Sequence, residues 1–163
     1  MAIQFTVEDG TGKTDATSYC TVAEFRQYWL NRGVVYAEDP APEDDEEQAT
    51  TEEDKVKAYL NLATEYIDNL NFLGEPSSDT QALQWPRIGI TDVDSNEIPK
   101  ALKNACCFLG GNSTRLNVVA DGVKAESFGP VSKTYTGLAI QFPVAEKLLA
   151  KYMIAGNTLV RVN

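Results

Sequence analysis

The sequence predicts a mainly α-helical fold, a bundle of about four helices with one extended β-hairpin and with extended N- and C-terminal arms. Two patterns predict it. Apolar residues recur every three or four positions in several segments, which is the period of an amphipathic helix, whereas one later segment alternates like a strand. A chain of 163 residues also suits a single domain, which at this length buries roughly 70% of its unfolded surface.

Residues 1–18 are expected to form the N-terminal arm, because a brief alternation at residues 3–7 gives way to Gly, Thr and Asp. The helical domain is expected over residues 19–156. Its first helix should begin at Thr21, since Thr21 and Glu24 have the spacing of a capping box. Gly33 is well placed to end this helix.

An acidic loop is expected at residues 37–51. The segment from Glu38 to Asp54 holds ten carboxylates and no basic residue, so it cannot bury enough apolar surface to order itself. The whole chain has 24 acidic and 14 basic residues, which leaves 14 of each outside this segment. A second helix should follow, capped by Thr50 with Glu53, and its apolar face consists of Val56, Tyr59, Leu60, Ala63, Ile67 and Leu70.

The second half of the chain predicts two more helices and the hairpin. A long connection at residues 74–98, rich in glycine and proline, leads to a third helix that starts near Pro99. Alternating residues around a Gly-Pro break predict a β-hairpin at residues 122–137. A last helix should run from Pro143 to Gly156, before an apolar C-terminal tail at residues 157–163.

The three cysteines are expected to be buried thiols. Cys106 and Cys107 are neighbours on a predicted helix, so their side chains diverge and cannot form a structural disulfide with each other. Cys20 would be the third thiol. The number of cysteines and their spacing fit neither a disulfide framework nor a C-x-x-C metal site.

Residue types that most enzymes need are missing. The chain has no histidine, which removes the commonest general base and the commonest metal ligand. Residues 12–14 are similar to the end of a phosphate-binding loop, but Val7 stands where that loop requires its first glycine. Residues 92–96 match the start of a calcium loop, but Glu97 replaces its required glycine. We therefore predict no catalytic residue, no cofactor, no metal and no enzyme activity.

Residues suited to nucleic acids are present but scattered. Phosphate binding depends on clustered lysine and arginine, whereas the lysines here form separate pairs on predicted helices. Aromatic side chains can stack on bases. At helical or strand spacing, however, they are more often core or interface residues, which is the interpretation we favour for Tyr28, Trp29, Trp85 and Tyr135.

Four segments, in order along the chain, carry a resemblance to a known family. They are residues 16–24 (ATSYCTVAE), 63–68 (ATEYID), 81–87 (QALQWPR) followed by Ile98-Pro99, and 122–130 (GVKAESFGP). Together they resemble the head-to-tail connector family of tailed bacteriophages, whose members are neck adaptor or head-completion proteins. The same family is also labelled as a DnaT-like single-stranded-DNA-binding protein.

This resemblance implies a structural virion protein that forms a homo-oligomeric, dodecameric ring in the neck, between the portal protein and the tail or a second neck protein. Double-stranded DNA would pass through the ring without specific binding during packaging and ejection. The subunit would be made in the host cytoplasm, and no membrane partner is expected, because no stretch approaches the ~20 apolar residues of a membrane span. The alternative is a single-stranded-DNA-binding replication protein, which a salt titration of binding distinguishes.

Two groups of residues are candidate functional sites in the connector interpretation. The acidic loop would face the DNA lumen or a rim, and its candidates are Asp44, Asp45, Glu46 and Glu47. Extended elements can pair with a neighbouring chain. The candidates for contact with another subunit or partner are Trp85, Arg87, Val123, Phe128, Tyr135, Leu159, Val160 and Val162.

Overall fold

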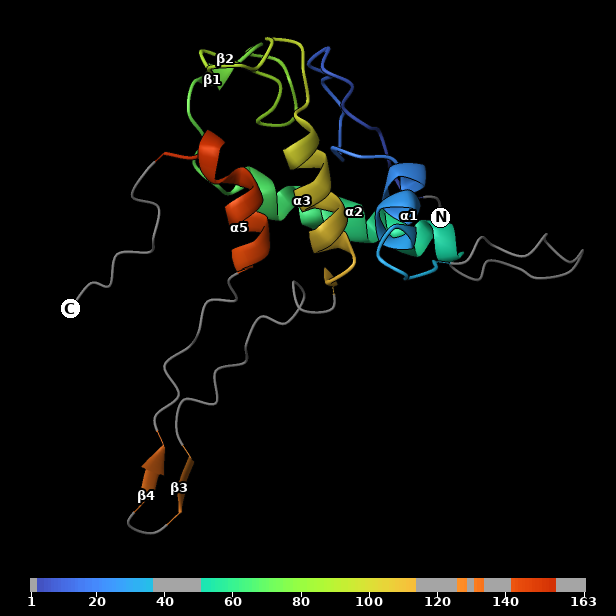
Figure 1. Ribbon diagram of the computed structural model, residues 1–163, viewed down its shortest axis with the longest axis vertical. Helices are drawn as coiled ribbons and strands as arrows, with labels where there is room; N and C mark the ends of the chain where they lie inside the picture. Colours follow the sequence, from blue (N-terminus) through green and yellow to red (C-terminus); the bar gives the residue numbers. More distant parts are fainter. Residues whose placement is uncertain (1–2, 37–50, 114–125, 129–130, 134–141, 155–163) are drawn as a thin grey trace, which may run out of the picture.

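The structure of the protein is a computed structural model that describes residues 3–36, 51–113, 126–128, 131–133 and 142–154 (Figure 1). These residues contain the helices α1 (Val22–Leu30), α2 (Glu52–Asp68), α3 (Lys100–Gly110) and α5 (Pro143–Leu149), the last continued by the 3-10 turn η1 (Ala150–Tyr152). Two antiparallel strand pairs accompany them, β1 (Glu75–Pro76) with β2 (Arg87–Ile88) and β3 (Glu126–Phe128) with β4 (Val131–Lys133). The predicted mainly helical fold with a hairpin is confirmed.

Helix α1 begins and ends where local sequence signals predict. The Thr21 hydroxyl accepts a hydrogen bond from the Glu24 N–H at 3.0 Å, and the Glu24 carboxylate accepts one from the Thr21 N–H at 2.8 Å. Gly33 has φ of 77°, and the N–H groups of Gly33 and Val34 donate back to the carbonyls of the last helical turn. Glycine suits this ending because a residue with a Cβ resists positive φ.

Helix α2 is capped one residue later than predicted. Its N-cap is Thr51, whose hydroxyl accepts a hydrogen bond from the Asp54 N–H at 3.1 Å, and Thr50 lies outside the described residues. Three carboxylates occupy the first turn, where the helix dipole stabilises negative charge. The buried face of the helix consists of Val56, Leu60, Ala63, Thr64 and Ile67.

Helix α3 is the centre of the bundle. It contacts α1, α2 and α5, and Figure 1 shows it between α1 and α5. Pro99 is its N-cap, with an extended ψ of 140°, rather than its first helical residue. Near its C-terminal end, a Cβ added to Gly110 would lie 3.1 Å from Leu60 and 3.3 Å from Phe25, so the three helices meet closely at this point.

The last helix ends earlier than predicted. Helix α5 stops at Leu149 and η1 ends at Tyr152, instead of continuing to Gly156. The Leu73 N–H donates to the Tyr152 carbonyl at 2.8 Å, and Met153 forms an antiparallel bridge with Phe72. These bonds to a segment distant in sequence replace the helical bonds that would continue the element.

The N-terminal arm contains no helix in its described residues, 3–18, and lies against the helical body. The Thr17 N–H donates to the Thr6 carbonyl at 2.8 Å, so the arm folds back on itself. The Ala82 N–H donates to the Lys13 carbonyl at 2.8 Å, which joins the arm to the connection between α2 and α3. Tyr19, at the base of the arm, is completely buried.

The connection between α2 and α3 is part of the core. The Trp85 ring is completely buried and meets Phe72 and Tyr152 edge-on, with ring centroids 5.6 and 5.4 Å apart. Gly74, with φ of 69°, allows β1 to approach β2, because a Cβ there would lie 2.1 Å from the Ile88 carbonyl oxygen. The length of this connection therefore reflects specific packing.

The predicted hairpin is confirmed over its described residues. Strands β3 and β4 pair antiparallel in the register Glu126 with Lys133, Ser127 with Ser132 and Phe128 with Val131. The outer parts of the predicted hairpin, at 122–125 and 134–137, lie outside the described residues. So do residues 37–50 of the acidic loop and the C-terminal tail at 157–163.

Candidate functional site

Three partly exposed aromatic rings lie together where α1 packs on the C-terminal end of α3. We call the surface formed by Trp29, Tyr36 and Phe108, with Arg32 beside them, the α1–α3 surface. The Trp29 ring centroid lies 6.1 Å from that of Tyr36 and 6.5 Å from that of Phe108, with an interplanar angle of 21° to Phe108. Phe25 is fully buried and packs edge-on against Trp29. The rings therefore form one cluster with a solvent-facing side.

The Trp29 ring is held in one position by the end of α3. Its Nε1–H donates at 3.0 Å to the Cys107 carbonyl, which also accepts a hydrogen bond from the Gly111 N–H at the end of the helix. The indole lies directly over Gly111, where an added Cβ would be 2.2 Å from a ring carbon. Only glycine leaves room for the ring at this place, so Gly111 fixes how α1 sits on α3.

Arg32 is exposed next to the rings. Its guanidinium carbon lies 3.5 Å from the centroid of the Tyr28 ring, and its Nη1 donates to the Tyr28 carbonyl at 2.8 Å. This stacked position orders the side chain and leaves it at the surface. Three large apolar residues around it are also exposed, Leu30 at 54%, Val34 at 40% and Val35 at 77%.

The charge at this surface comes from Arg32. Residues 25–36 contain two arginines and no carboxylate, whereas the chain has a net charge of −10. Lys100 and Lys103 are at the other end of α3, where Lys103 is paired with Glu24 at 2.7 Å. The α1–α3 surface is thus an aromatic region with an exposed guanidinium on an acidic protein.

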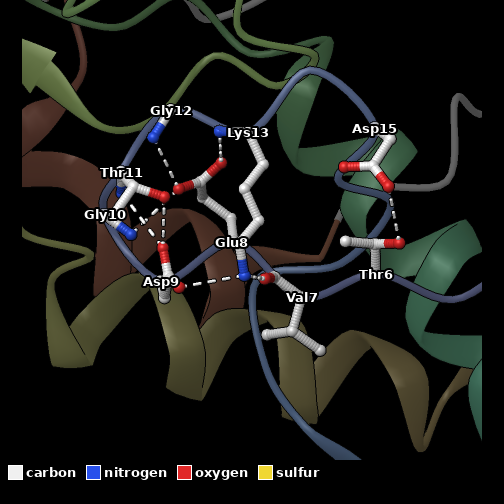
Figure 2. A network of polar contacts seen from close by, with 9 residues as sticks. All are labelled: Thr6, Val7, Glu8, Asp9, Gly10, Thr11, Gly12, Lys13 and Asp15. Atoms are coloured by element: carbon white, nitrogen blue, oxygen red, sulfur yellow. Dashed lines mark hydrogen bonds and ion pairs between the residues drawn. The ribbon is translucent and has the colours of Figure 1, made fainter.

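The glycine-rich segment of the N-terminal arm binds an anion that belongs to the chain itself (Figure 2). The Glu8 carboxylate, which is completely buried, accepts hydrogen bonds from the N–H groups of Gly10 and Gly12, both at 2.9 Å, and of Lys13 at 2.7 Å. Lys13 donates its Nζ to the Val7 carbonyl at 2.8 Å and pairs with Asp9. A phosphate would need these same amides. The loop is therefore a closed structural turn.

A half-buried carboxylate, that of Asp68, lies at the C-terminal end of α2. Asp68 accepts hydrogen bonds from the Tyr19 hydroxyl and, at 3.3 Å, from the Gln84 N–H. Burial raises the pKa of Asp68 from 3.8 to about 6, although these hydrogen bonds and the charge of Arg87 act in the opposite direction. Burial and the neighbouring Asp68 charge raise the pKa of Tyr19, which therefore stays protonated as the donor.

Trp85 and Arg87, two candidates for partner contacts, are used within the chain. Trp85 is completely buried and Arg87 is 5% exposed. The Arg87 guanidinium donates to the carbonyls of Leu73 and Gly74 at 2.9 and 2.7 Å, and to the Gln84 side chain at 2.8 Å. These contacts explain why the QALQWPR segment is needed for the fold.

The other candidate residues fall outside the described part of the chain. They are Asp44, Asp45, Glu46, Glu47, Val123, Tyr135, Leu159, Val160 and Val162. Phe128 lies in β3, where the structure describes the backbone pairing and not the side chain. Contact of these residues with another subunit stays a prediction.

The three cysteines are buried free thiols, as predicted. Cys20 and Cys107 are close, with a distance of 3.4 Å between their Sγ atoms, and Cys106 contacts the Thr64 hydroxyl at 3.6 Å. Hydrogen bonding to Cys106 and Cys107, together with burial, raises the pKa of the Cys20 thiol. A thiol in this state is a poor nucleophile.

Within the described ranges, no group of three or more acidic or cysteine residues is arranged to hold a metal ion. The Asp92–Glu97 segment forms a turn, in which the Glu97 N–H donates to the Asp94 carbonyl at 3.0 Å. In the same part of the chain, none of the helices has the length and apolarity that would let it cross a membrane.

Sequence reasoning singled out Trp29 but not the surface around it. A signal was present, because residues 25–36 combine two arginines with four aromatic residues and lack any carboxylate, in a chain rich in acids. Phe108 gave no such signal. Its proximity to Trp29 depends on how α1 packs on α3.

Comparison with known proteins bears on the role of this fold. A family model described as "Putative DnaT-like ssDNA binding protein" matches residues 3–163. Searches of curated proteins and of solved structures gave no match. The match spans every described element, from the N-terminal arm to η1.

This finding corrects the predicted role. The prediction of a structural virion protein, a connector between portal and tail that acts in DNA packaging and ejection, is wrong, because the matching family is described by single-stranded-DNA binding. The alternative in the sequence interpretation agrees better with the match. The segments that suggested a connector include Trp85 and Arg87, whose buried side chains mark the fold rather than a partner. The chain belongs to the family of DnaT-like single-stranded-DNA-binding proteins.

Proposed function

We propose that the protein binds single-stranded DNA and acts through binding rather than catalysis. The observation that carries the proposal is the family match over residues 3–163. Because the match covers the whole described fold and not one short motif, it supports the proposal for the chain as a unit. The chemistry of the α1–α3 surface supports the same function.

The net charge of −10 opposes binding of a polyanion at long range. Salt screens this repulsion, with a Debye length of about 8 Å at physiological ionic strength, so local contacts decide affinity. Proteins that bind single strands without sequence preference combine cationic groups with aromatic rings on which bases stack. The α1–α3 surface provides both kinds of group, without a carboxylate in the segments that form it.

Catalysis has less support. The chain has no histidine. Asp68 has a raised pKa, which is common at active sites, but its oxygens accept hydrogen bonds from Tyr19 and from the backbone of Gln84. The role of Asp68 in holding Tyr19 and Gln84 within the fold explains these hydrogen bonds.

Equilibrium binding tests the proposal. Fluorescence anisotropy of a labelled oligodeoxythymidine of about 20 nucleotides is measured at about 20 mM salt and then at rising salt. We expect sub-micromolar binding that weakens as salt rises, and at least tenfold weaker binding of a duplex of the same length, whose bases are not open to stacking, as an order-of-magnitude expectation. Micromolar or weaker binding at the lowest salt would contradict the proposal.

A further inference from the structure

We propose that single-stranded DNA binds at the α1–α3 surface, with bases stacking on Trp29, Tyr36 and Phe108 and with Arg32 contacting the phosphate backbone. This inference rests on the proposed function and names the site and mode of binding. It follows from two features that lie together here: clustered, partly exposed rings and an exposed guanidinium beside them.

The rings are positioned before any ligand binds. The hydrogen bond from Trp29 to the Cys107 carbonyl and the close packing on Gly111 fix the indole. The nearly parallel Phe108 ring and the neighbouring Tyr36 ring extend this fixed surface. A DNA strand that stacks there causes little loss of side-chain conformational entropy in the protein, which favours affinity.

Arg32 is suited to the backbone of the strand. Its side chain is exposed, and stacking on Tyr28 keeps it near the rings. Arg32 follows Trp29 by three positions, and the Arg32 N–H donates to the Trp29 carbonyl at 2.9 Å, so both residues belong to the same end of α1. A planar guanidinium can pair with a phosphate through two N–H groups or stack on a base.

This arrangement predicts binding led by stacking, with few phosphate contacts. Arg32 is the basic side chain placed beside the rings. Each phosphate neutralised on a single strand contributes a slope of about −0.7 to the logarithm of affinity against the logarithm of salt, so one contact gives about −0.7. A protein that bound mainly through phosphates would have a steeper slope.

A second copy of the chain is the competing occupant. A stable protein interface buries roughly 20–30 residues on each side, several times the size of this cluster. Two chains of charge −10 also repel each other. The aromatic cluster with its exposed guanidinium therefore fits a nucleic acid strand better than another acidic subunit.

The test compares two variants that each remove one positive charge. Arg32→Gln changes the α1–α3 surface, whereas Lys147→Gln changes an exposed lysine of α5, a helix that packs on α3 and is not in contact with α1. We expect about five- to tenfold weaker binding of oligodeoxythymidine for Arg32→Gln and less than about twofold for Lys147→Gln. Circular dichroism establishes that both variants are folded.

Tryptophan fluorescence of the unmodified protein gives a second readout. The chain has two tryptophans, and Trp85 is completely buried, so a base that quenches fluorescence on contact must reach Trp29. We expect quenching with the same midpoint as the anisotropy change. Tight binding without quenching, and with equal affinities for the two variants, would overturn this site while leaving DNA binding intact.

Two other outcomes are also decisive. Failure of the unmodified protein to bind any single strand would overturn the proposed function and this inference together. A dimer in sedimentation is the other outcome. If Val35→Ser dissociated that dimer without changing DNA affinity, the surface would be assigned to a second copy of the chain, and the proposed DNA site would be overturned. Val35 is suited to this control because it is 77% exposed beside Tyr36.

Discussion

The half-buried carboxylate of Asp68 predicts a measurable dependence of stability on pH. Its pKa is about 6 in the folded protein, compared with 3.8 in its ordinary state. Between these values the folded chain keeps a proton that the unfolded chain has lost, so the free energy of unfolding decreases as pH rises through this window. Below pH 3.8 the stabilising contribution is complete, and above pH 6 it is lost.

The size of the effect follows from the shift. A difference of 2.2 pKa units corresponds to about 3 kcal/mol at 1.36 kcal/mol per unit. About 1.4 kcal/mol of this change falls between pH 5 and pH 8, where the folded carboxyl ionises and the unfolded one is already ionised. Glu24 does not titrate in this range: burial acts to raise its pKa, but hydrogen bonding and ion pairing with Lys103 lower it below the usual 4.5. A variant of Asp68 isolates the effect of that carboxyl.

Asp68→Asn provides the comparison. The amide oxygen can still accept the Tyr19 hydroxyl, but the amide nitrogen faces the Gln84 N–H, so the variant loses one hydrogen bond at every pH. Urea unfolding at pH 5 and pH 8 gives the free energy of unfolding of both proteins. The stability of the natural chain relative to the variant should fall by about 1.4 kcal/mol between the two pH values.

A control removes the effect of net charge. Asp79→Asn deletes a carboxylate at an exposed position, and its difference from the natural chain gives the contribution of one surface charge. If Asp68→Asn and Asp79→Asn changed in parallel between pH 5 and pH 8, burial of Asp68 would not control this pH dependence, and the reasoning would be refuted.

Three further predictions concern the arm, the first helix and the acidic loop. Gly10→Ala should destabilise the protein by about 2 kcal/mol or more, because φ is 101° and the new Cβ would lie 1.9 Å from the Asn96 carbonyl oxygen. Gly33→Ala, whose new Cβ would have no atom within 4 Å, should cost only about 1 kcal/mol. Similar losses of stability for the two variants in thermal unfolding would contradict this prediction. Thr21→Ala should lower the free energy of unfolding by about 1 kcal/mol through loss of the capping box, and an unchanged urea midpoint would show that the cap contributes nothing. Replacing Asp44, Asp45, Glu46 and Glu47 by serine should raise the affinity for single-stranded DNA at low salt and have little effect at high salt. Equal affinities of the natural chain and the variant at low salt would show that this charge does not oppose binding.

Local signals predicted the elements whose ends depend on neighbouring residues. Helix α1 has both its capping box and its terminal glycine in the sequence, and both are used. The cap of α2 was predicted one residue too early, because adjacent threonines at positions 50 and 51 offer the same hydroxyl. The end of α5 depends on hydrogen bonds to residues 71–73, which no local pattern reveals.

The α1–α3 surface was harder to predict. Trp29 was interpreted as a core or interface residue from its helical spacing. Its ring does pack inside the fold, on Gly111, but part of the ring stays exposed. The segments that suggested a connector were misleading for a related reason. Their tryptophan and arginine are buried, so they identify a fold without specifying what that fold contacts.

Photo-crosslinking tests the central claim most directly. An oligodeoxynucleotide in which thymidines are replaced by 5-iododeoxyuridine, a base that crosslinks on irradiation to aromatic side chains stacked on it, is bound to the protein, and the attached peptides are identified by mass spectrometry. We predict crosslinks in residues 25–36 and at Phe108, which form the α1–α3 surface. Crosslinks confined to other parts of the chain, or the absence of any crosslink under conditions of saturation, would contradict the account.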